Sequence, residues 1–168
     1  FDLSPDGKTI YVSNEDEGEA SFIDTATGKK LQSVKVGKEP EGVKVSPDGK
    51  RIYVTSEVAN MVHVVDATSY QVLKNIAVAK RPRRFAFSAD GGELWVTSEL
   101  GGSVTVIGTR DLNVAATIPL LSRLAEAIRI PPALKVPEFT IISARRAGLI
   151  PRVRPSGAAL ATRSMPRL

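Results

Sequence analysis

Three glutamates recur at a fixed spacing of 42 residues, at Glu15, Glu57 and Glu99. Carboxylates held at one radius around a common axis could together bind a hard divalent cation, because such ions prefer oxygen ligands. Two other uses are open: each carboxylate could accept hydrogen bonds from backbone N–H groups of its own turn, or pair with a neighbouring lysine or arginine. The recurrence in every repeat favours these structural uses.

Two charged segments, 38–41 (Lys-Glu-Pro-Glu) and 80–84 (Lys-Arg-Pro-Arg-Arg), are related by the same spacing. Such loops could form a rim that recognises an anionic partner or a protein surface. Alternatively they are solvated loops whose exposed ion pairs each contribute about 0–1 kcal/mol. The candidate binding residues are Glu15, Lys38, Glu39, Glu41, Glu57, Arg81, Arg83, Arg84 and Glu99.

Few other residues could support catalysis. The chain has no cysteine and one histidine, His63, which excludes thiol-ligated metals and multi-histidine sites. His63 stands where the other repeats have Ser21 and Thr105, so we expect it to face partial solvent. Trp95 stands where the other repeats have tyrosine, so we expect it in the core and not as a cofactor platform. Neither a nucleophile elbow nor a phosphate-binding glycine loop is visible, and the sequence predicts no catalytic residue, resident metal or cofactor.

An internal repeat must position these residues. The segment Ser4-Pro5-Asp6-Gly7-Lys8 recurs at 46–50 and, altered, at 88–92, both times 42 residues further on. Each repeat indicates four short strands, which in the second repeat are 43–45, 51–56, 61–65 and 72–78. Proline and glycine in the recurring segment favour a tight turn before the second strand. Asp24 begins a second turn, in which its carboxylate can cap backbone N–H groups.

Four-stranded units of this length, repeated in tandem, are typical of β-propeller blades. We therefore predict an all-β fold, a partial propeller of three blades over residues 1–120 (1–42, 43–84 and 85–120). Because blades stack face to face, both faces of the middle strands should be largely buried. Ligands of propellers usually bind where the loops between the fourth and first strands meet those between the second and third, and this is where the candidate residues lie.

The segment 37–55, Gly-Lys-Glu-Pro-Glu-Gly-Val-Lys-Val-Ser-Pro-Asp-Gly-Lys-Arg-Ile-Tyr-Val-Thr, resembles the YVTN-type propeller repeat. Within that family, residues 1–120 are similar to periplasmic propeller proteins associated with pyrroloquinoline-quinone-dependent alcohol catabolism. The resemblance implies a non-catalytic binding or scaffold module, periplasmic or secreted, with a protein or small-molecule partner on the propeller face. The alternative is a lactonase-type propeller hydrolase with a divalent metal on the axis, because such enzymes use the same architecture.

The repeat ends near Leu120, and the composition changes there. Residues 1–120 contain 14 basic residues (Lys and Arg) and 16 acidic residues (Asp and Glu). Residues 121–168 contain 9 basic and 2 acidic residues. We expect 121–168 to be an irregular or weakly structured basic tail, of the kind that translation of GC-rich DNA in a shifted frame would produce. Its arginines could bind nucleic acid or anionic lipid without specificity, but no specific nucleic-acid partner is predicted, and no apolar run is long enough for a membrane span.

Three blades cannot close a ring, since propellers typically have four to eight. Phe1 aligns with Val43 and Phe85, inside the first strand of a blade, so we expect a fragment of a longer propeller. The two uncovered blade faces would expose apolar area that normally meets a neighbour. We therefore expect self-association, or a partly molten state, when the chain is made alone.

Overall fold

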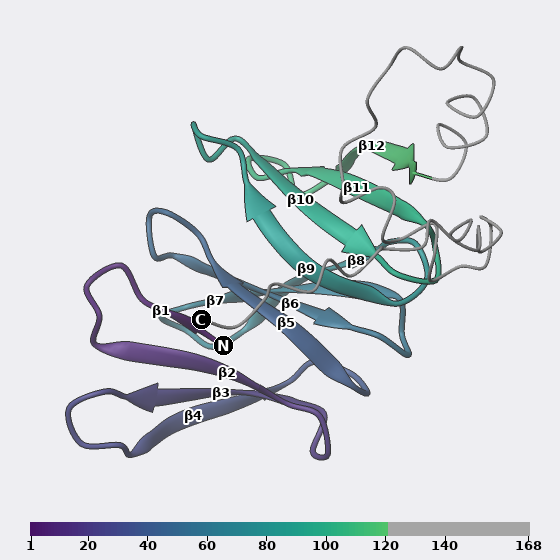
Figure 1. Ribbon diagram of the computed structural model, residues 1–168. Coiled ribbons are helices and arrows are strands. Elements are labelled where there is room, and N and C mark those ends of the chain that lie inside the picture. The colour runs from purple at the N-terminus through teal and green to yellow at the C-terminus, as the bar shows by residue number, and fades with distance from the viewer. Residues whose placement is uncertain (121–168) are drawn as a thin grey trace, which may run out of the picture. The chain divides into compact units, whose positions relative to one another are not determined.

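The computed structural model describes residues 1–120, in which twelve β-strands form three antiparallel four-stranded sheets (Figure 1). Blade 1 contains β1 (Asp2–Leu3), β2 (Thr9–Asn14), β3 (Glu19–Asp24) and β4 (Lys30–Lys35). Blade 2 contains β5 (Pro40–Val45), β6 (Arg51–Ser56), β7 (Met61–Asp66) and β8 (Val72–Ala77). Blade 3 contains β9 (Pro82–Phe87), β10 (Glu93–Ser98), β11 (Ser103–Gly108) and β12 (Val114–Pro119).

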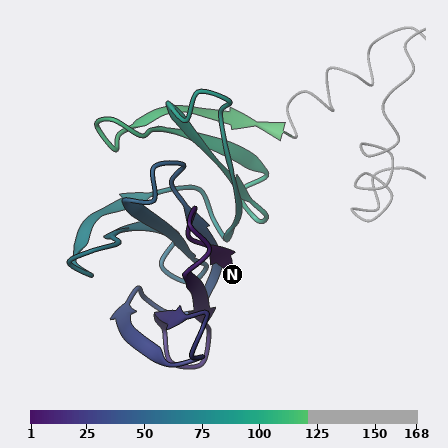
Figure 2. The ribbon, with the colours of Figure 1, turned by 90° about the vertical axis from the view of Figure 1, so that its left-hand side faces the viewer.

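This arrangement confirms the predicted fold class, a partial β-propeller. In each blade the strands pair in sequence order, and the two views agree that the sheet of blade 2 lies between the other two (Figures 1 and 2). β6 spans the predicted residues, and β7 and β8 end within one residue of their predicted ends. β5 starts earlier than predicted, because Pro40 also pairs with Ser56 across an irregularity in the ladder.

The recurring Pro-Asp-Gly turn has the predicted left-handed glycine. The φ angles of Gly7, Gly49 and Gly91 are 71°, 72° and 69°. These turns also meet between blades: a Cβ added to Gly49 would lie 3.2 Å from Cδ of Pro5, and one added to Gly91 would lie 3.3 Å from Cγ of Pro47. The glycine therefore serves both the turn and the close approach of the preceding blade's proline.

The turn before the fourth strand is capped as predicted. The N–H of Thr27 donates to Oδ1 of Asp24 at 2.7 Å, and the hydrogen bonds from Thr27 hold the pKa of this carboxyl below its usual value. Gly28 has a φ of 67°, but Tyr70 and Leu112 adopt φ angles of 61° and 58° at the equivalent places. The 42-residue period thus extends to the backbone conformation, even where the residue type has changed.

Adjacent blades pack through side chains that alternate along the second strand of each blade. Ile52 and Val54 lie in an apolar cluster with Tyr11 of blade 1, whereas Tyr53 lies in a second cluster with residues of blade 3. The Tyr53 ring meets Phe87 edge-on, with centroids 5.7 Å apart. Even-numbered residues of the strand therefore face the preceding blade, and odd-numbered residues face the following one.

Among the three described blades, only blade 2 buries both faces of its second strand. In β6 every residue after Arg51 is buried, but in β10 buried and exposed residues alternate. The prediction that Trp95 lies in the core is wrong: its side chain is 39% exposed, whereas the equivalent Tyr53 is fully buried. Trp95 faces away from blade 2, and within the described residues no further blade covers it.

The prediction that His63 faces partial solvent is also wrong, since only 7% of its surface is exposed. Its Nδ1 lies 2.7 Å from Oδ1 of Asn75, so Nδ1 carries the hydrogen of this bond. Nε2 is buried and has no hydrogen-bond partner among the described residues, and a Cβ on Gly37 would lie 3.2 Å from it. Burial lowers the pKa of His63 from 6.5, because the site disfavours the imidazolium.

Residues 121–168, including the predicted basic tail, lie outside the described residues. Within residues 1–120, no helix is long and apolar enough to cross a membrane.

We predict that His63 makes the fold sensitive to acid. The native state binds a proton at His63 less readily than the unfolded chain does. The contribution of the neutral His63 to the free energy of unfolding is therefore complete above about pH 6.5, and it decreases as the pH falls below that value. His63→Ser, which introduces the residue that blade 1 has at Ser21, should flatten the pH dependence between neutral and mildly acidic conditions. Urea unfolding at a series of pH values measures this, and equal slopes in the two proteins would contradict it.

Candidate functional site

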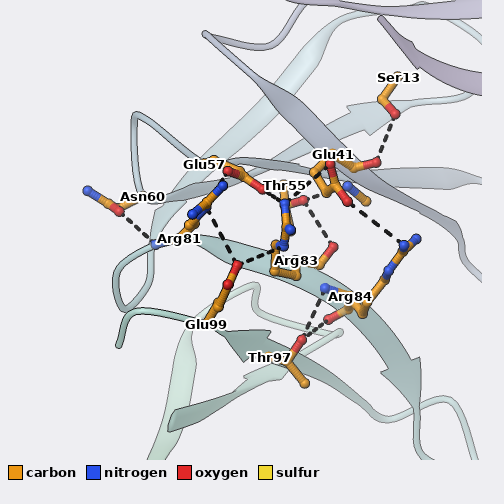
Figure 3. Close-up of polar contacts among 11 residues, drawn as sticks. Ser13, Glu41, Thr55, Glu57, Asn60, Arg81, Arg83, Arg84, Thr97 and Glu99 are labelled. Carbon is orange, nitrogen blue, oxygen red and sulfur yellow. Dashed lines mark hydrogen bonds and ion pairs between the residues drawn. The ribbon is translucent and has the colours of Figure 1, made fainter. Parts of the chain in front are cut away.

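The candidate residues gather at one end of the blades, which we call the rim. It consists of the loops that contain residues 15–18, 37–41, 57–60, 79–84 and 99–102. Figure 3 shows its central part, in which charged side chains from β5, β9 and the neighbouring loops point toward one another. The rim therefore combines the two loop types that the sequence singled out.

β-Bulges position the charged side chains at the starts of β5 and β9. Pro40 pairs with Ser56 and Val43 with Val54, so Glu41 and Gly42 lie together opposite Thr55. In blade 3 the same irregularity places Arg83 and Arg84 opposite Thr97. In a regular strand, successive side chains point to opposite faces, and a bulge changes these directions locally. Here the bulges direct charged side chains at the starts of β5 and β9 into the rim.

The threonine opposite the bulge joins two blades. Oγ1 of Thr55 accepts the N–H of Gly42 in its own blade at 2.7 Å and lies 3.3 Å from the carbonyl oxygen of Arg83 in blade 3, to which it donates. Ser13, the equivalent in blade 1, donates to the carbonyl of Glu41 at 2.8 Å (Figure 3). The backbone that carries each charged rim residue is thus held by the preceding blade.

The sequence reasoning missed this role of Thr55. The available signal was the recurrence of Ser13, Thr55 and Thr97 at the 42-residue spacing, which marks a hydroxyl as a fixed requirement of the repeat.

Two non-glycine residues with positive φ shape the loops between blades. Glu39 and Arg81 have φ angles of 52° and 58°, and their carbonyl oxygens accept the N–H groups of Glu57 and Glu99 at 3.0 and 2.9 Å. Such left-handed conformations are uncommon for residues with a Cβ and persist where the surroundings enforce them. At Arg81 the side chain of Asn60, from the loop between β6 and β7 of blade 2, supplies part of this constraint, because its Oδ1 accepts the N–H of Arg81 at 3.0 Å.

Glu57 is the centre of an ion-pair network. The residue is 7% exposed, and one carboxylate oxygen lies 2.7 Å from Nε of Arg81, while the other contacts Nη1 of Arg83. A buried carboxylate is costly unless it is paired and hydrogen-bonded. The two guanidinium groups provide that pairing and hold Glu57 in one position.

The network extends to both sides of Glu57. Glu99 lies 3.1 Å from Nε of Arg83 and 3.6 Å from Nε of Arg81. On the other side, Glu41 lies 3.5 Å from Nη1 of Arg83 and 3.8 Å from Nη2 of Arg84 (Figure 3). Carboxylates and guanidinium groups therefore alternate across blades 2 and 3.

The remaining candidate residues lie at the edge of this network. The side chains of Lys38 and Glu39 are exposed, and both residues contribute to the rim through hydrogen bonds to their backbone carbonyl groups. The carbonyl oxygen of Lys38 accepts the hydroxyl of Ser56 at 2.7 Å. Glu15 reaches the network only through Glu41: the hydrogen bond between the two carboxyl groups and their mutual repulsion raise the pKa of Glu15. Glu15 is thus the one recurring glutamate that meets another acid instead of an arginine.

An open pocket of about 240 Å³ lies beside the network. The exposed side chains of Val58 and Leu100, from equivalent loops of blades 2 and 3, line it together with Arg81 and Lys80. Asp16 stands at the equivalent place in blade 1, so this position changes from acidic in blade 1 to apolar in blades 2 and 3, and the basic residues of the rim concentrate in the loop that begins blade 3, at 80–84. The arrangement can offer hydrogen bonds, charges and apolar contacts to one partner.

A larger pocket, of about 390 Å³, lies at the opposite end, between blades 2 and 3. It is lined by Asp48, Lys50, Asp90 and the guanidinium-bearing Arg51, which already donates to the carbonyl of Thr109 at 2.5 Å. The guanidinium group of Arg51 is therefore already used in a contact between blades 2 and 3. Among residues 1–120, no group of three or more metal-ligating side chains could hold a metal ion.

Comparison with protein-family models finds a match to the YNCE-like beta-propeller over residues 1–92, more than half of the chain. Among solved structures, hydrazine synthase of Kuenenia stuttgartiensis is similar, with 32% identity and a TM-score of 0.66 over 68% of this chain and 33% of that chain. Comparison with curated protein sequences gave no match.

Two further structures show the fold alone. Dihydro-heme d1 dehydrogenase NirN in complex with DHE has 23% identity and a TM-score of 0.61, over 71% of this chain and 25% of that chain. The WD40 repeats of RRP9 have 20% identity and a TM-score of 0.64, over 70% of this chain and 37% of that chain. The chain thus spans between a quarter and about two-fifths of the length of these structures.

We predict that Glu15→Gln stabilises the protein at neutral pH. Because the native state raises the pKa of Glu15, its ionisation costs native stability as the pH rises through that pKa, and the neutral amide removes this cost. The gain in thermal midpoint should vanish below about pH 4.5, where the unfolded chain also binds the proton. Glu17→Gln, a change in the same loop, is the control; an equal effect of both substitutions at pH 7 would show that general acidity and not Glu41 is the cause.

Proposed function

Because the chain belongs to the YNCE-like β-propeller family, we propose that it is a non-catalytic binding or scaffold module that uses its rim to recognise a protein surface. The observation that carries this proposal is the pocket lined by Val58 and Leu100 next to the arginine–glutamate network. The propeller fold supports such a role, since it places equivalent loops of successive blades side by side.

The chemistry of the rim favours a protein surface over a small ion. Val58 and Leu100 are 54% and 68% exposed, so they offer apolar area that a partner would cover. Arg81 is held by Glu57 through Nε and is 42% exposed on its side chain, which leaves donor groups at the pocket. Protein interfaces commonly have an apolar core surrounded by a polar rim, and arginine is enriched in them.

The same contacts argue against the lactonase-type alternative. A divalent metal on the axis would need several carboxylates directed at one point, but Glu57 and Glu99 are paired with Arg81 and Arg83. A metal would have to displace both guanidinium groups from Glu57. We therefore propose no catalytic residue and no resident cofactor for this chain.

The YVTN-type repeat at 37–55 supports a more specific proposal. On this basis the protein is periplasmic or secreted and accompanies quinoprotein alcohol oxidation without itself holding the quinone. This part of the proposal rests on the resemblance of the repeat and is independent of the rim geometry.

We predict that peptides selected from a phage-displayed library against the immobilised full chain bind at the rim. The double substitution Val58→Ser and Leu100→Ser should weaken their binding by roughly tenfold or more, as expected for loss of buried apolar anchors. Binding is measured by isothermal titration with the synthetic peptides. Leu73→Ser removes an apolar side chain of comparable exposure (48%) from β8, away from the rim, and should leave binding unchanged.

Two results would contradict the proposal. One is a set of selected peptides whose affinity is the same for the rim variant and the parent chain. The other is hydrolysis of lactones that requires added divalent metal and is abolished by Glu57→Gln, which would establish the enzyme instead.

A further inference from the structure

The larger pocket, at the end of the blades opposite the rim, has walls from both blade 2 and blade 3. Its volume is about 390 Å³, which lies in the range of roughly 300–1,000 Å³ that small-molecule sites occupy. Residues of the turns 46–50 and 90–91 line it, together with Arg51, Tyr53, Phe87 and Thr109. We call it the turn pocket. A ligand held there would contact both blades at once.

The hydroxyl of Tyr53, which lines the turn pocket, is a buried donor without a partner. Tyr53 is fully buried, and its hydroxyl oxygen makes no hydrogen bond within residues 1–120. Burial raises the pKa of this phenol, whereas the positive charge of Arg51 acts in the opposite direction. The hydroxyl therefore keeps its proton at neutral pH, with the guanidinium group near it. A buried polar group without a partner costs stability, so an acceptor that enters the pocket would satisfy this hydroxyl.

Arg51 supplies further donors to the turn pocket. Its Nη1 donates to the carbonyl oxygen of Thr109, which holds the side chain between the two blades and leaves further N–H groups of the guanidinium as donors. The repeat does not require arginine here, because the equivalent residues are Thr9 and Glu93. The planar guanidinium group matches the geometry of a carboxylate. Arg51 and the nearby hydroxyl of Tyr53 thus offer a place for a carboxylate.

Two aspartates supply acceptors to the same pocket. Oδ1 of Asp48 accepts the hydroxyl of Ser46 at 2.6 Å, and Oδ1 of Asp90 accepts that of Ser88 at 2.6 Å. These hydrogen bonds and others from backbone N–H groups lower the pKa of both carboxyl groups, so both are ionised at neutral pH. In the described blades neither Oδ2 accepts a hydrogen bond. Each turn thus uses one oxygen of its aspartate and leaves the other to a ligand.

The charges of the turn pocket balance without pairing. The two aspartates stand against Lys50 and Arg51, and within residues 1–120 none of the four side chains forms an ion pair. The charges of Lys50 and Arg51 contribute to the lowered pKa of Asp48, but no basic side chain of the described blades does so at Asp90. Asp90 is therefore the carboxylate of this pocket whose charge calls for a cationic group of a ligand.

We propose that the turn pocket binds an α-amino acid with an apolar side chain. The carboxylate of the amino acid accepts hydrogen bonds from Tyr53 and Arg51, and its ammonium group donates to Asp90. Its side chain lies against the apolar wall that Phe87 and Pro47 provide. The site is at the opposite end of the blades from the rim, so this inference does not depend on the proposed recognition of a protein surface.

The presence of both charges on the ligand distinguishes it from other small molecules. An inorganic anion such as phosphate would meet the carboxylates of Asp48 and Asp90. A neutral sugar would find donors and acceptors, but it would leave the charge of Asp90 without a counter-charge. A zwitterion offers a partner to both ends of the pocket, and charges attract more strongly in a partly buried site than in water.

The first experiment varies the ligand and leaves the protein unchanged. Saturation-transfer NMR with the full chain tests L-leucine, L-valine and L-phenylalanine, and isothermal titration then measures affinity. We expect at least one of them to bind, and its amino alcohol and its deaminated acid each to bind about tenfold more weakly or worse. No binding of the three at millimolar concentration, equal affinity of either analogue, or binding of glucose or phosphate alone would overturn the proposal.

The second experiment changes the protein. Tyr53→Phe removes an unpartnered hydroxyl and keeps the ring, so it should weaken binding about tenfold without lowering the thermal midpoint of the free chain. Asp90→Asn keeps an oxygen for the turn and should also weaken binding, whereas Asp6→Asn, the same change in the equivalent turn of blade 1, should not. Unchanged affinity of Tyr53→Phe, or equal losses in the two asparagine variants, would contradict the proposal. The ligand series decides it even if a substitution unfolds the chain.

Discussion

The hydroxyl that Thr55 places between two blades is the interaction on which the other features depend. Its oxygen accepts the N–H of Gly42 within blade 2 and donates to the carbonyl of Arg83 in blade 3, at 2.7 and 3.3 Å. A single atom thus stabilises a bulge and fixes the distance to the next blade. Gly42 satisfies the same constraint, because a Cβ there would lie 2.1 Å from that carbonyl. Where no further blade follows within the described residues, Thr97 turns back to the carbonyl of Arg84 in its own blade, at 3.4 Å.

The rim is a consequence of this packing. The bulge turns Glu41 and Arg83 toward the loops, and the hydroxyl holds the backbone beneath them. Arg83 can then reach Glu57, whose burial requires paired charges. Glu39 and Arg81, which have positive φ angles, connect the loops through backbone hydrogen bonds to Glu57 and Glu99. These bonds fix the backbone positions from which the charged side chains extend. The exposed apolar side chains of Val58 and Leu100 lie beside the arginine–glutamate network and are available to a partner.

Much of this structure could be predicted from the period of the sequence. The turns at Gly49 and Asp24 and the limits of β6 depend on local residues, and the repeat displays each of them more than once. The environment of Trp95 could not be predicted in this way, because it depends on whether another blade follows and not on the residue type. Nor could the pairing of Glu57 with Arg81 and Arg83 be distinguished from a metal site, since the spacing brings carboxylates and arginines to the same rim and only side-chain geometry decides between them.

The pair Thr55 and Thr97 allows the most direct test of blade packing through the hydroxyl, because the two residues share a place in the repeat, but among the described residues only Thr55 has a following blade to contact and only Thr55 is buried. Urea unfolding of Thr55→Val and Thr97→Val measures the difference. The account predicts a loss of about 1–3 kcal/mol for Thr55→Val, which leaves a buried N–H and a carbonyl without their partner. It predicts a loss within about 0.5 kcal/mol for the exposed Thr97. Equal losses at the two positions would contradict it.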